Sequence, residues 1–277
     1  MPQITKDPNG QSHVVVRTPA VSGSVHLHGA TVTGWTPAKN EPVLWTSSEA
    51  VYDGQTPIRG GVPLCVPWFG AHPTDPDSPS HGLARTATWT LDLADESEKE
   101  TRLGFGLELP GLKLTYDVLL GHVLKLVLEI TNEGDSDRRV EAALHTYLAV
   151  SDAREVTITG LENVGYIDKV GGPTQVDATG ESIRFVAETD RVYGSTVDDV
   201  VLHDPGLKRQ ITVAKEGGAS TVIWNPWVAK AASMKDFGDD EWTGMCCIES
   251  AAVGDDAWTL APGATKALQA EVSVTAI

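Results

Sequence analysis

Short runs of apolar and β-branched residues recur along almost the whole chain, and Gly, Pro, Asn or Asp separates one run from the next. Such runs are typical of β-strands joined by turns, whereas helical periodicity is nearly absent. Residues 121–122 and 204–206 each separate two such runs and are expected to form hairpin turns. The best helical candidate, residues 228–237, is too short to anchor a layer. The pattern therefore predicts an all-β fold with antiparallel sheets.

The length of the chain sets the expected number of domains. It has 277 residues, and β-sandwiches and barrels of about 200–250 residues commonly form one domain. The sequence has no internal repeat, low-complexity tract or long linker that would mark a boundary. We therefore expect a single domain over residues 1–277.

Cysteine usage and the absence of targeting segments bear on the compartment. The three cysteines are an odd number, and Cys246 and Cys247 are adjacent on a predicted strand, where their side chains should point to opposite faces. The first residues lack a cationic stretch followed by an apolar run, and no window approaches the roughly 18 apolar residues of a membrane span. A reduced cytoplasmic location is the expectation.

Charge restricts the class of partner. The chain carries 21 basic and 38 acidic residues, a net charge of -17, which repels nucleic acids and anionic lipid surfaces. We therefore expect neither a nucleic-acid nor a membrane partner. We also expect a monomer that binds a small molecule. An anionic ligand would need a local cationic pocket, because the overall field opposes it.

Residues 57–70, PIRGGVPLCVPWFG, contain one charged side chain, Arg59, in an otherwise apolar, proline-rich loop. Gly60 and Gly61 let the backbone turn sharply or approach a ligand closely. An ion pair that only holds the loop is one explanation for Arg59, and a ligand contact is the other.

A second loop, residues 80–89 (SHGLARTATW), contains His81 and Arg85. If this loop meets the first, Arg59 and Arg85 together offer guanidinium forks that suit the oxygens of a phosphate group. His81 could contact a sugar hydroxyl or could be a hydrogen-bonded structural group. The pair of arginines favours phosphate binding.

A histidine and a glutamate in apolar surroundings are the candidates for acid/base chemistry. His145 is the one histidine in residues 141–147, an apolar segment that is predicted to be a strand, and Glu249 lies in the apolar segment 245–252. A buried carboxylate is costly without a partner or a function. If both side chains project into one cleft, they form an acid/base pair whose pKa values burial moves toward neutrality.

Other polar and aromatic side chains are weaker candidates. Asp190, in residues 188–193, could orient sugar hydroxyls or form a surface ion pair. Trp224 and Trp227 could stack on a sugar, although core packing is the simpler explanation for at least one of them.

Neither a metal nor an organic cofactor is expected. The eight histidines show no metal-ligand spacing, and His26 and His28 lack a nearby Cys or Glu. The glycine pairs lack the longer pattern and the following helix of a nucleotide-binding loop.

Six segments, taken together and in order, resemble the hexose-6-phosphate mutarotase branch of the aldose 1-epimerase family. They are PIRGGVPLCVPWFG, SHGLARTATW, ALHTYLAVSD, ETDRVY, NPWVAKAASMKDFGDDEW and CIESAAV. Order and spacing agree from about Arg59 to the C-terminus, and the departures are small, such as Leu148 and Cys247. The resemblance implies a large antiparallel β-sandwich of the galactose mutarotase-like type, with a cleft across one sheet and no cofactor.

The resemblance also implies roles for individual residues. His145 corresponds to the general acid and Glu249 to the general base, which open the sugar ring and close it again with the opposite configuration at the anomeric carbon. Arg59 and Arg85 fall on positions that hold the 6-phosphate, and His81 and Asp190 fall on positions that contact the sugar. The expected pH profile is a bell with its acidic limb from Glu249 and its alkaline limb from His145.

The expected reaction is thus the interconversion of the α and β anomers of a hexose 6-phosphate, with D-glucose 6-phosphate as the first candidate. Two alternatives stay open: a mutarotase for neutral aldoses, and a carbohydrate-binding β-sandwich without turnover. Which hexose is preferred depends on hydroxyl contacts that a sequence does not specify.

Overall fold

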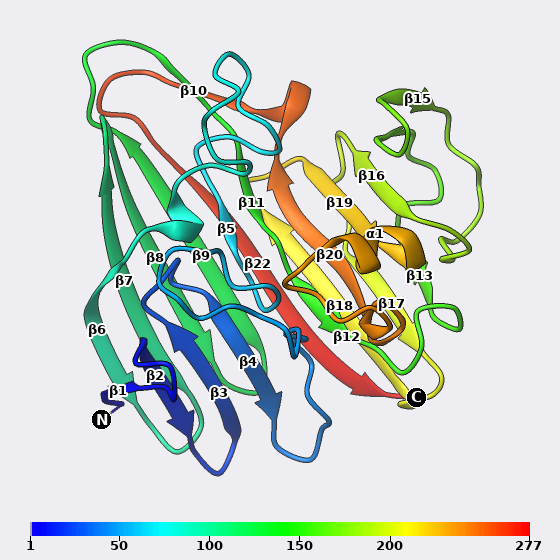
Figure 1. Ribbon diagram of the computed structural model, residues 1–277, viewed down its shortest axis with the longest axis horizontal. Helices are drawn as coiled ribbons and strands as arrows, with labels where there is room; N and C mark the ends of the chain where they lie inside the picture. Colours follow the sequence, from blue (N-terminus) through cyan, green and yellow to red (C-terminus); the bar gives the residue numbers. More distant parts are fainter. Residues whose placement is uncertain (1) are drawn as a thin grey trace.

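The computed structural model describes residues 2–277, and two eight-stranded sheets dominate it (Figure 1). All pairs of strands within the sheets are antiparallel among the described residues, so the predicted all-β antiparallel architecture is confirmed. The two large sheets pack against each other where β11 and β20 of one contact β22 of the other. We call them the cleft sheet and the back sheet.

The cleft sheet has the order β15-β14-β16-β19-β20-β11-β5, and β12 also pairs with β20. Its strands are β5 (Leu64–Cys65), β11 (Ala142–Leu144), β12 (Tyr147–Ala149), β14 (Tyr166–Asp168), β15 (Thr174–Val176), β16 (Thr189–Tyr193), β19 (Ser220–Asn225) and β20 (Met245–Ala252).

The back sheet has the order β13-β17-β18-β22-β9-β8-β7-β6. Its strands are β6 (Thr90–Glu96), β7 (Thr101–Leu109), β8 (Leu112–Leu120), β9 (Leu124–Asn132), β13 (Thr157–Thr159), β17 (Val200–Asp204), β18 (Arg209–Glu216) and β22 (Thr265–Ala276). Both predicted hairpins are present: Leu120 pairs with Leu124, and Asp204 pairs with Arg209.

Smaller elements complete the fold. An N-terminal sheet comprises β1 (Ile4–Lys6), β2 (Ser12–Arg17), β3 (Val21–His26) and β4 (Val32–Pro37), and a two-stranded ribbon comprises β10 (Arg138–Val140) and β21 (Trp258–Leu260). The helical segments are α1 (Trp227–Ser233) and the short 3-10 turns η1 (Ala84–Thr86), η2 (Glu241–Gly244) and η3 (Gly254–Asp256). None of the helices in residues 2–277 is long and apolar enough to cross a membrane.

Alternation along the strands decides which side chains enter the core. In β8 and β9 every second residue is buried, because successive side chains of a strand point to opposite faces. The resulting core also takes in residues of the N-terminal sheet and of the cleft sheet. One face of the cleft sheet therefore packs on this core, and the opposite face bears the candidate active site that is described below.

All eight residues of β20 are buried, which makes it the longest fully buried strand in residues 2–277. Cys246 and Ile248 enter the main core, whereas Cys247 packs in a separate cluster on the other face. The two cysteines therefore point to opposite faces, as predicted, and Glu249 shares its face with Cys247. A carboxyl group is thus fixed on the cleft side of a fully buried strand.

Candidate active site

His145 and Glu249 meet on the face of the cleft sheet that is turned away from the main core. Nε2 of His145 lies 3.4 Å from Oε1 of Glu249. Strand pairing produces this contact, because Leu144 pairs with Ser250 and Tyr147 pairs with Cys247, which leaves His145 opposite Glu249. The sequence predicted this approach of the two side chains.

The prediction of an unbroken strand through His145 is wrong. β11 ends at Leu144 and β12 begins at Tyr147. The break arises because the N–H of Thr146 turns back and donates to the carbonyl of Leu144 at 2.9 Å, which closes a three-residue turn. The imidazole of His145 then stacks on the ring of Tyr147, with 4.8 Å between the ring centroids.

Burial controls the protonation of both groups. It raises the pKa of Glu249 well above its usual value, Asp190 raises it further, and Lys169 and Arg85 partly oppose the rise. Burial lowers the pKa of His145 well below its usual value, and the positive charges of Arg59 and Arg85 act in the same direction. The resting pair therefore holds one proton over a wide range of pH.

These directions change the assignment of the two limbs of the pH profile. Because the pKa of His145 is lowered, the acidic limb corresponds to a second proton bound by the pair, on His145. Because the pKa of Glu249 is raised, the alkaline limb corresponds to loss of the last proton, from Glu249. The expected bell shape is retained, but burial reverses the limbs that unperturbed pKa values predict.

His81 lies beside His145, with 5.9 Å between the ring centroids. Its Nδ1 accepts a hydrogen bond from the N–H of Gly70 at 3.2 Å, so the ring proton of the neutral form is on Nε2. Burial, followed by the charges of Arg85, Lys169 and Arg59, lowers the pKa of His81 to about 3. At neutral pH this side chain is a fixed hydrogen-bond donor.

Arg59 has a carboxylate partner, which is one of the two possibilities that the sequence left open. Its Nε and Nη2 donate to the two carboxylate oxygens of Asp236 at 3.1 and 3.3 Å, and Nη1 donates to the hydroxyl of Tyr147 at 3.0 Å. The following glycines are required here, because a Cβ on Gly61 would lie 2.1 Å from the carbonyl oxygen of Val32. Arg59 is thus held rigidly at the edge of the site.

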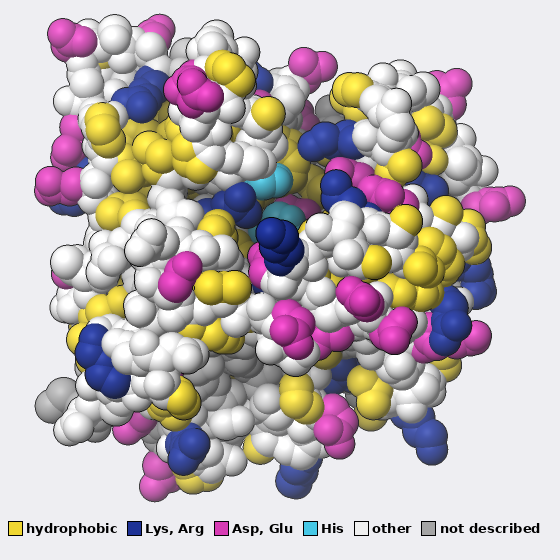
Figure 2. All heavy atoms as spheres, in the orientation of Figure 1, with side chains coloured by type: hydrophobic (Ala, Val, Ile, Leu, Met, Phe, Trp, Pro, Cys, Tyr) yellow, Lys and Arg dark blue, Asp and Glu magenta, His cyan; other side chains and the backbone are white. Residues whose placement is uncertain are grey.

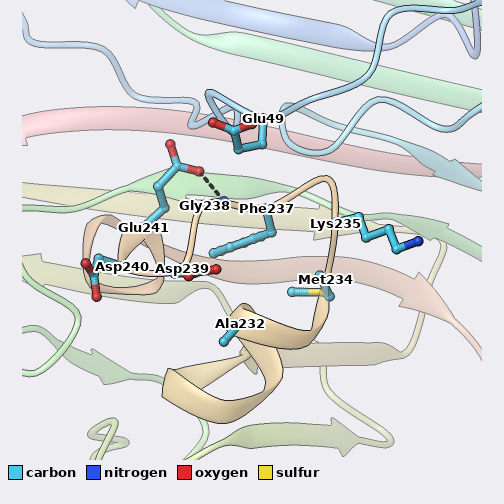
Figure 3. Close-up of a pocket in the computed structure, with 9 residues that line it drawn as sticks. All are labelled: Glu49, Ala232, Met234, Lys235, Phe237, Gly238, Asp239, Asp240 and Glu241. Carbon is cyan, nitrogen blue, oxygen red and sulfur yellow. Dashed lines mark hydrogen bonds between the residues drawn. The ribbon is translucent and has the colours of Figure 1, made fainter.

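The loop after α1 presents Asp236 to Arg59, and Glu241 holds this loop in place. The carboxylate of Glu241 accepts hydrogen bonds from the hydroxyl of Ser47 at 2.7 Å and from the N–H of Ser48 at 2.9 Å. It also accepts one from the N–H of Gly238 at 3.0 Å, which Figure 3 marks with a dashed line. A hollow of about 660 Å³ beside the loop is lined by Glu49, Ala232, Met234, Lys235, Phe237, Gly238, Asp239, Asp240 and Glu241. Its carboxylates make it unsuitable for a phosphate group.

Arg85 has fewer hydrogen-bond partners than Arg59. Its Nη2 donates to the carbonyl of Ser80 at 2.7 Å, and its buried Nε has no partner among the residues that the structure describes. The charges of Arg59 and Arg85 both act on His81 and His145. Both arginines therefore border the histidines, and Figure 2 shows histidine atoms in a hollow near the middle of this face, with Lys or Arg atoms on both sides.

Asp190 lies on β16, where it pairs with Trp224 of β19, and burial raises its pKa. The ring of Trp224 is close to that of His145, with 6.0 Å between the centroids. Trp227 instead packs on Trp242 at 4.3 Å, so packing accounts for this one of the two tryptophans. All six predicted site residues thus border the same space.

Three residues around this space were not singled out from the sequence: Tyr147, Lys169 and Asp236. Tyr147 stacks on His145 and accepts a hydrogen bond from Arg59. Asp236 is 177 positions from Arg59 along the chain, so no local pattern connects them. Lys169 lies in a turn, DKVGG, whose composition indicates only a solvated loop.

Comparisons with known proteins agree with this geometry. A family model described as aldose 1-epimerase matches residues 12–273. A Cenchrus ciliaris protein named "Putative glucose-6-phosphate 1-epimerase" is 32% identical over 280 residues, which cover 94% of this chain and 84% of that protein.

Two solved structures show the same fold. A Salmonella typhimurium protein described as a "putative mutarotase" aligns with a TM-score of 0.91 and 28% identity, over 100% of this chain and 97% of that one. A galactose mutarotase-like protein from Clostridium acetobutylicum aligns with a TM-score of 0.75 and 12% identity, over 100% and 99% of the two chains. The predicted galactose mutarotase-like β-sandwich is confirmed.

Proposed function

The chain belongs to the aldose 1-epimerase family and is an isomerase, and from this premise we propose that it interconverts the α and β anomers of a hexose 6-phosphate, with D-glucose 6-phosphate as the preferred substrate. The observation that carries the proposal is the 3.4 Å contact between His145 and Glu249, with Arg59 and Arg85 beside it. The relative named for glucose 6-phosphate supports the choice of substrate.

The same two side chains can catalyse both ring opening and ring closure, because each of them can donate and accept a proton. Glu249, as the carboxylate, accepts the proton of the anomeric hydroxyl while His145, as the imidazolium, donates a proton to the ring oxygen. The bond between the anomeric carbon and the ring oxygen breaks, and the free aldehyde forms. Rotation about the adjacent carbon–carbon bond exposes the other face of the aldehyde, and ring closure returns both protons.

The pair needs one proton in total, and this is the state that burial favours. In the resting pair the proton is on Glu249, and in the active pair it is on His145. The two forms are tautomers, and one proton transfer across the 3.4 Å contact interconverts them. His81 would donate its Nε2 proton to a sugar oxygen, and the carboxylate of Asp190 would accept a hydrogen bond from a hydroxyl.

Phosphate recognition would fall to Arg59 and Arg85. Asp236 and Tyr147 orient Arg59, and a phosphate would reach the guanidinium beside these partners. In Arg85 only Nη2 donates a hydrogen bond among the described residues, to the carbonyl of Ser80, so Nη1 can donate to a ligand. Neutral aldoses, as in the first alternative, would offer this guanidinium no anion, and a binding module without turnover would not need the acid/base pair.

We expect Arg59→Ala and Arg85→Ala each to lower kcat/KM for glucose 6-phosphate by about ten- to hundredfold. Hydrogen bonds to charged groups contribute about 1.5–3 kcal/mol, and 1.4 kcal/mol is about tenfold in affinity. The rate for glucose should change little, because glucose lacks the phosphate. Polarimetry that starts from the pure α anomer of each sugar measures both rates.

Arg102→Ala is the matched control, because Arg102 pairs with Asp117 on the back sheet at 3.2 Å and takes no part in the site. It should leave both rates unchanged. If the double variant of Arg59 and Arg85 kept the wild-type preference for glucose 6-phosphate over glucose, the phosphate site would lie elsewhere.

The proposal includes a monomeric, single-domain enzyme of the cytoplasm, without nucleic-acid or membrane partners. One core that joins the N-terminal sheet to both large sheets supports a single domain over residues 1–277. The three cysteines are free and buried, which supports a reducing compartment. The net charge of -17 supports the absence of nucleic-acid partners.

A further inference from the structure

A single side chain, Tyr147, contacts both the acid of the proposed reaction and one of the arginines that we assign to the phosphate. Its ring lies 4.8 Å from the ring of His145, centroid to centroid, with an angle of 14° between the two planes. Its hydroxyl accepts a hydrogen bond from Nη1 of Arg59 at 3.0 Å. Tyr147 is only 2% exposed, so solvent does not compete for either contact. The phenol therefore connects the two ends of the site.

The break between β11 and β12 brings the two rings together. On a regular strand, residues two positions apart are separated by about 6.6 Å along the strand. The turn at Thr146 lets the rings approach to 4.8 Å instead. The loop that carries Arg59 fixes both backbones: the N–H of His145 donates to the carbonyl of Pro63 at 3.0 Å, and the N–H of Tyr147 donates to the carbonyl of Gly61 at 2.9 Å. The imidazole is thus held against the phenol ring.

His145 lacks the partner that commonly orients an acid/base histidine. In such a histidine one ring nitrogen faces the substrate, and the other donates its N–H to a carboxylate or a backbone carbonyl. That hydrogen bond fixes the ring and stabilises the positive charge of the imidazolium. Nε2 of His145 faces Glu249, whereas its buried Nδ1 has no hydrogen-bond partner within residues 2–277. Another group must therefore hold this ring and stabilise its charge.

The π face of Tyr147 can do both. An aromatic ring attracts a cation that lies within about 6 Å of its centroid, most strongly where water is excluded. The ring of His145 is stacked within this distance, so its imidazolium form gains more from the contact than its neutral form does. Trp45 in turn stacks on Tyr147, with 5.7 Å between the centroids. The phenol itself stays neutral, because burial raises its pKa.

We propose that Tyr147 is a positioning residue whose ring holds His145 and stabilises the imidazolium that protonates the sugar, and whose hydroxyl holds Arg59 at the phosphate. This inference rests on the proposed function, because it assumes that His145 is the acid. It assigns the ring to kcat and the hydroxyl to KM, so that the two roles can be separated by experiment.

The groups around His145 determine how its protonation responds to loss of the ring. Burial lowers the pKa of His145, and the other cationic or titratable side chains His81, Arg59 and Arg85 lower it further. The thiols on the adjoining strands β5 and β20 are neutral, because burial raises their pKa values. Glu249 favours the imidazolium only after it has given up its own proton. Among these groups, the π face of Tyr147 is therefore the one that favours the imidazolium at every stage. The groups considered are Arg59, Cys65, His81, Arg85, Tyr147, Cys247 and Glu249.

Tyr147→Leu removes the ring together with its hydroxyl. We expect kcat to fall about tenfold for both glucose 6-phosphate and glucose, the effect of a cation–π contact in a site without water. The imidazolium becomes less stable, so the pKa of His145 falls and the acidic limb of the kcat–pH profile should move to lower pH. Polarimetry between about pH 4 and 9, which spans the reference values of both groups, measures the rate and the profile.

Tyr147→Phe removes the hydroxyl and keeps the ring. Arg59 then loses one of its two hydrogen-bond partners, so the KM for glucose 6-phosphate should rise about threefold to tenfold. The kcat and the acidic limb should stay close to those of the wild type, because the stacked ring is still present. The KM for glucose should not respond, because glucose has no phosphate.

A third replacement keeps the size of the ring and reverses its charge distribution. Pentafluorophenylalanine, incorporated at position 147, presents an electron-poor face that repels a cation. The kcat should therefore fall at least as far as in Tyr147→Leu, although the ring still fills its place. Tyr116→Leu is the matched control, because Tyr116 lies buried on β8 of the back sheet. It can lower the Tm, but kcat per folded molecule and the pH profile should be normal.

Three results would overturn the inference. If pentafluorophenylalanine left kcat and the acidic limb as they are in Tyr147→Phe, the ring would only fill space. If Tyr147→Phe lowered kcat as much as Tyr147→Leu does, the hydroxyl and not the ring would act on the acid. If Tyr147→Phe left the KM for glucose 6-phosphate unchanged, the hydroxyl would have no part in phosphate binding. Absence of mutarotation in the wild-type enzyme would instead overturn the proposed function.

Discussion

Replacing Glu249 by glutamine is expected to lower kcat for anomer interconversion by about 10²–10⁴-fold, the usual contribution of one positioned proton transfer. The amide has nearly the size and shape of the carboxyl group, but it cannot accept the anomeric proton. Substrate affinity should change little, because the arginines that we assign to the phosphate are untouched. Polarimetry gives kcat, and isothermal titration calorimetry gives the affinity.

Protein stability provides the control for this variant. The pKa of Glu249 is raised in the folded protein above its value of 4.5 in the unfolded chain. The stability that this raised pKa contributes is complete only below pH 4.5 and is lost as the pH rises through the folded pKa. A glutamine does not ionise, so the Glu249→Gln variant does not lose this stability as the pH rises. Its Tm at pH 7 should therefore equal or exceed that of the wild type. A near-normal kcat would refute the assignment of Glu249 as the base.

His145→Gln should also lower kcat by about 10²–10⁴-fold, because the amide cannot donate a proton to the ring oxygen. The imidazole is buried with a lowered pKa, so the unfolded chain binds its proton more readily than the folded one. Stability is therefore lost as the pH falls below 6.5, and His145→Gln should reduce this acid sensitivity. Thermal unfolding between about pH 5 and 8 measures it, across the usual range of histidine titration.

His28→Gln is the matched control for a buried histidine outside the site. His28 is 4% exposed, and its Nε2 is 2.9 Å from the carbonyl oxygen of Thr56. This change can destabilise the protein, but kcat per folded molecule should be normal. If His145→Gln retained wild-type kcat, another group would have to protonate the ring oxygen.

Local pattern was sufficient to predict the alternating strands of the back sheet and both hairpins. The alternation in β8 and β9 and the turn at residues 121–122 are properties of adjacent residues, and they hold in the structure. The break after Leu144 could not be predicted in this way, because the apolar segment suits a continuous strand. It depends on a turn at Thr146 that no Gly or Pro marks.

The candidate site was predictable where one residue was conspicuous in its own segment. Glu249 and His145 are polar groups in apolar segments, and Arg59 is the one charge in its loop. The partners Asp236 and Lys169 lie in polar turns where a charge is ordinary. Only the packing of distant segments brings Asp236 to Arg59 and Lys169 to Phe69.

The proposed reaction can be observed directly by exchange NMR on an equilibrium mixture of anomers. With the wild-type enzyme, exchange between the α and β signals of glucose 6-phosphate should be much faster than without enzyme, and much faster than enzyme-catalysed exchange of glucose at the same concentration. Glu249→Gln should return it close to the uncatalysed rate. Exchange of glucose 6-phosphate at the uncatalysed rate with wild-type enzyme, or equal acceleration of glucose, would contradict the account.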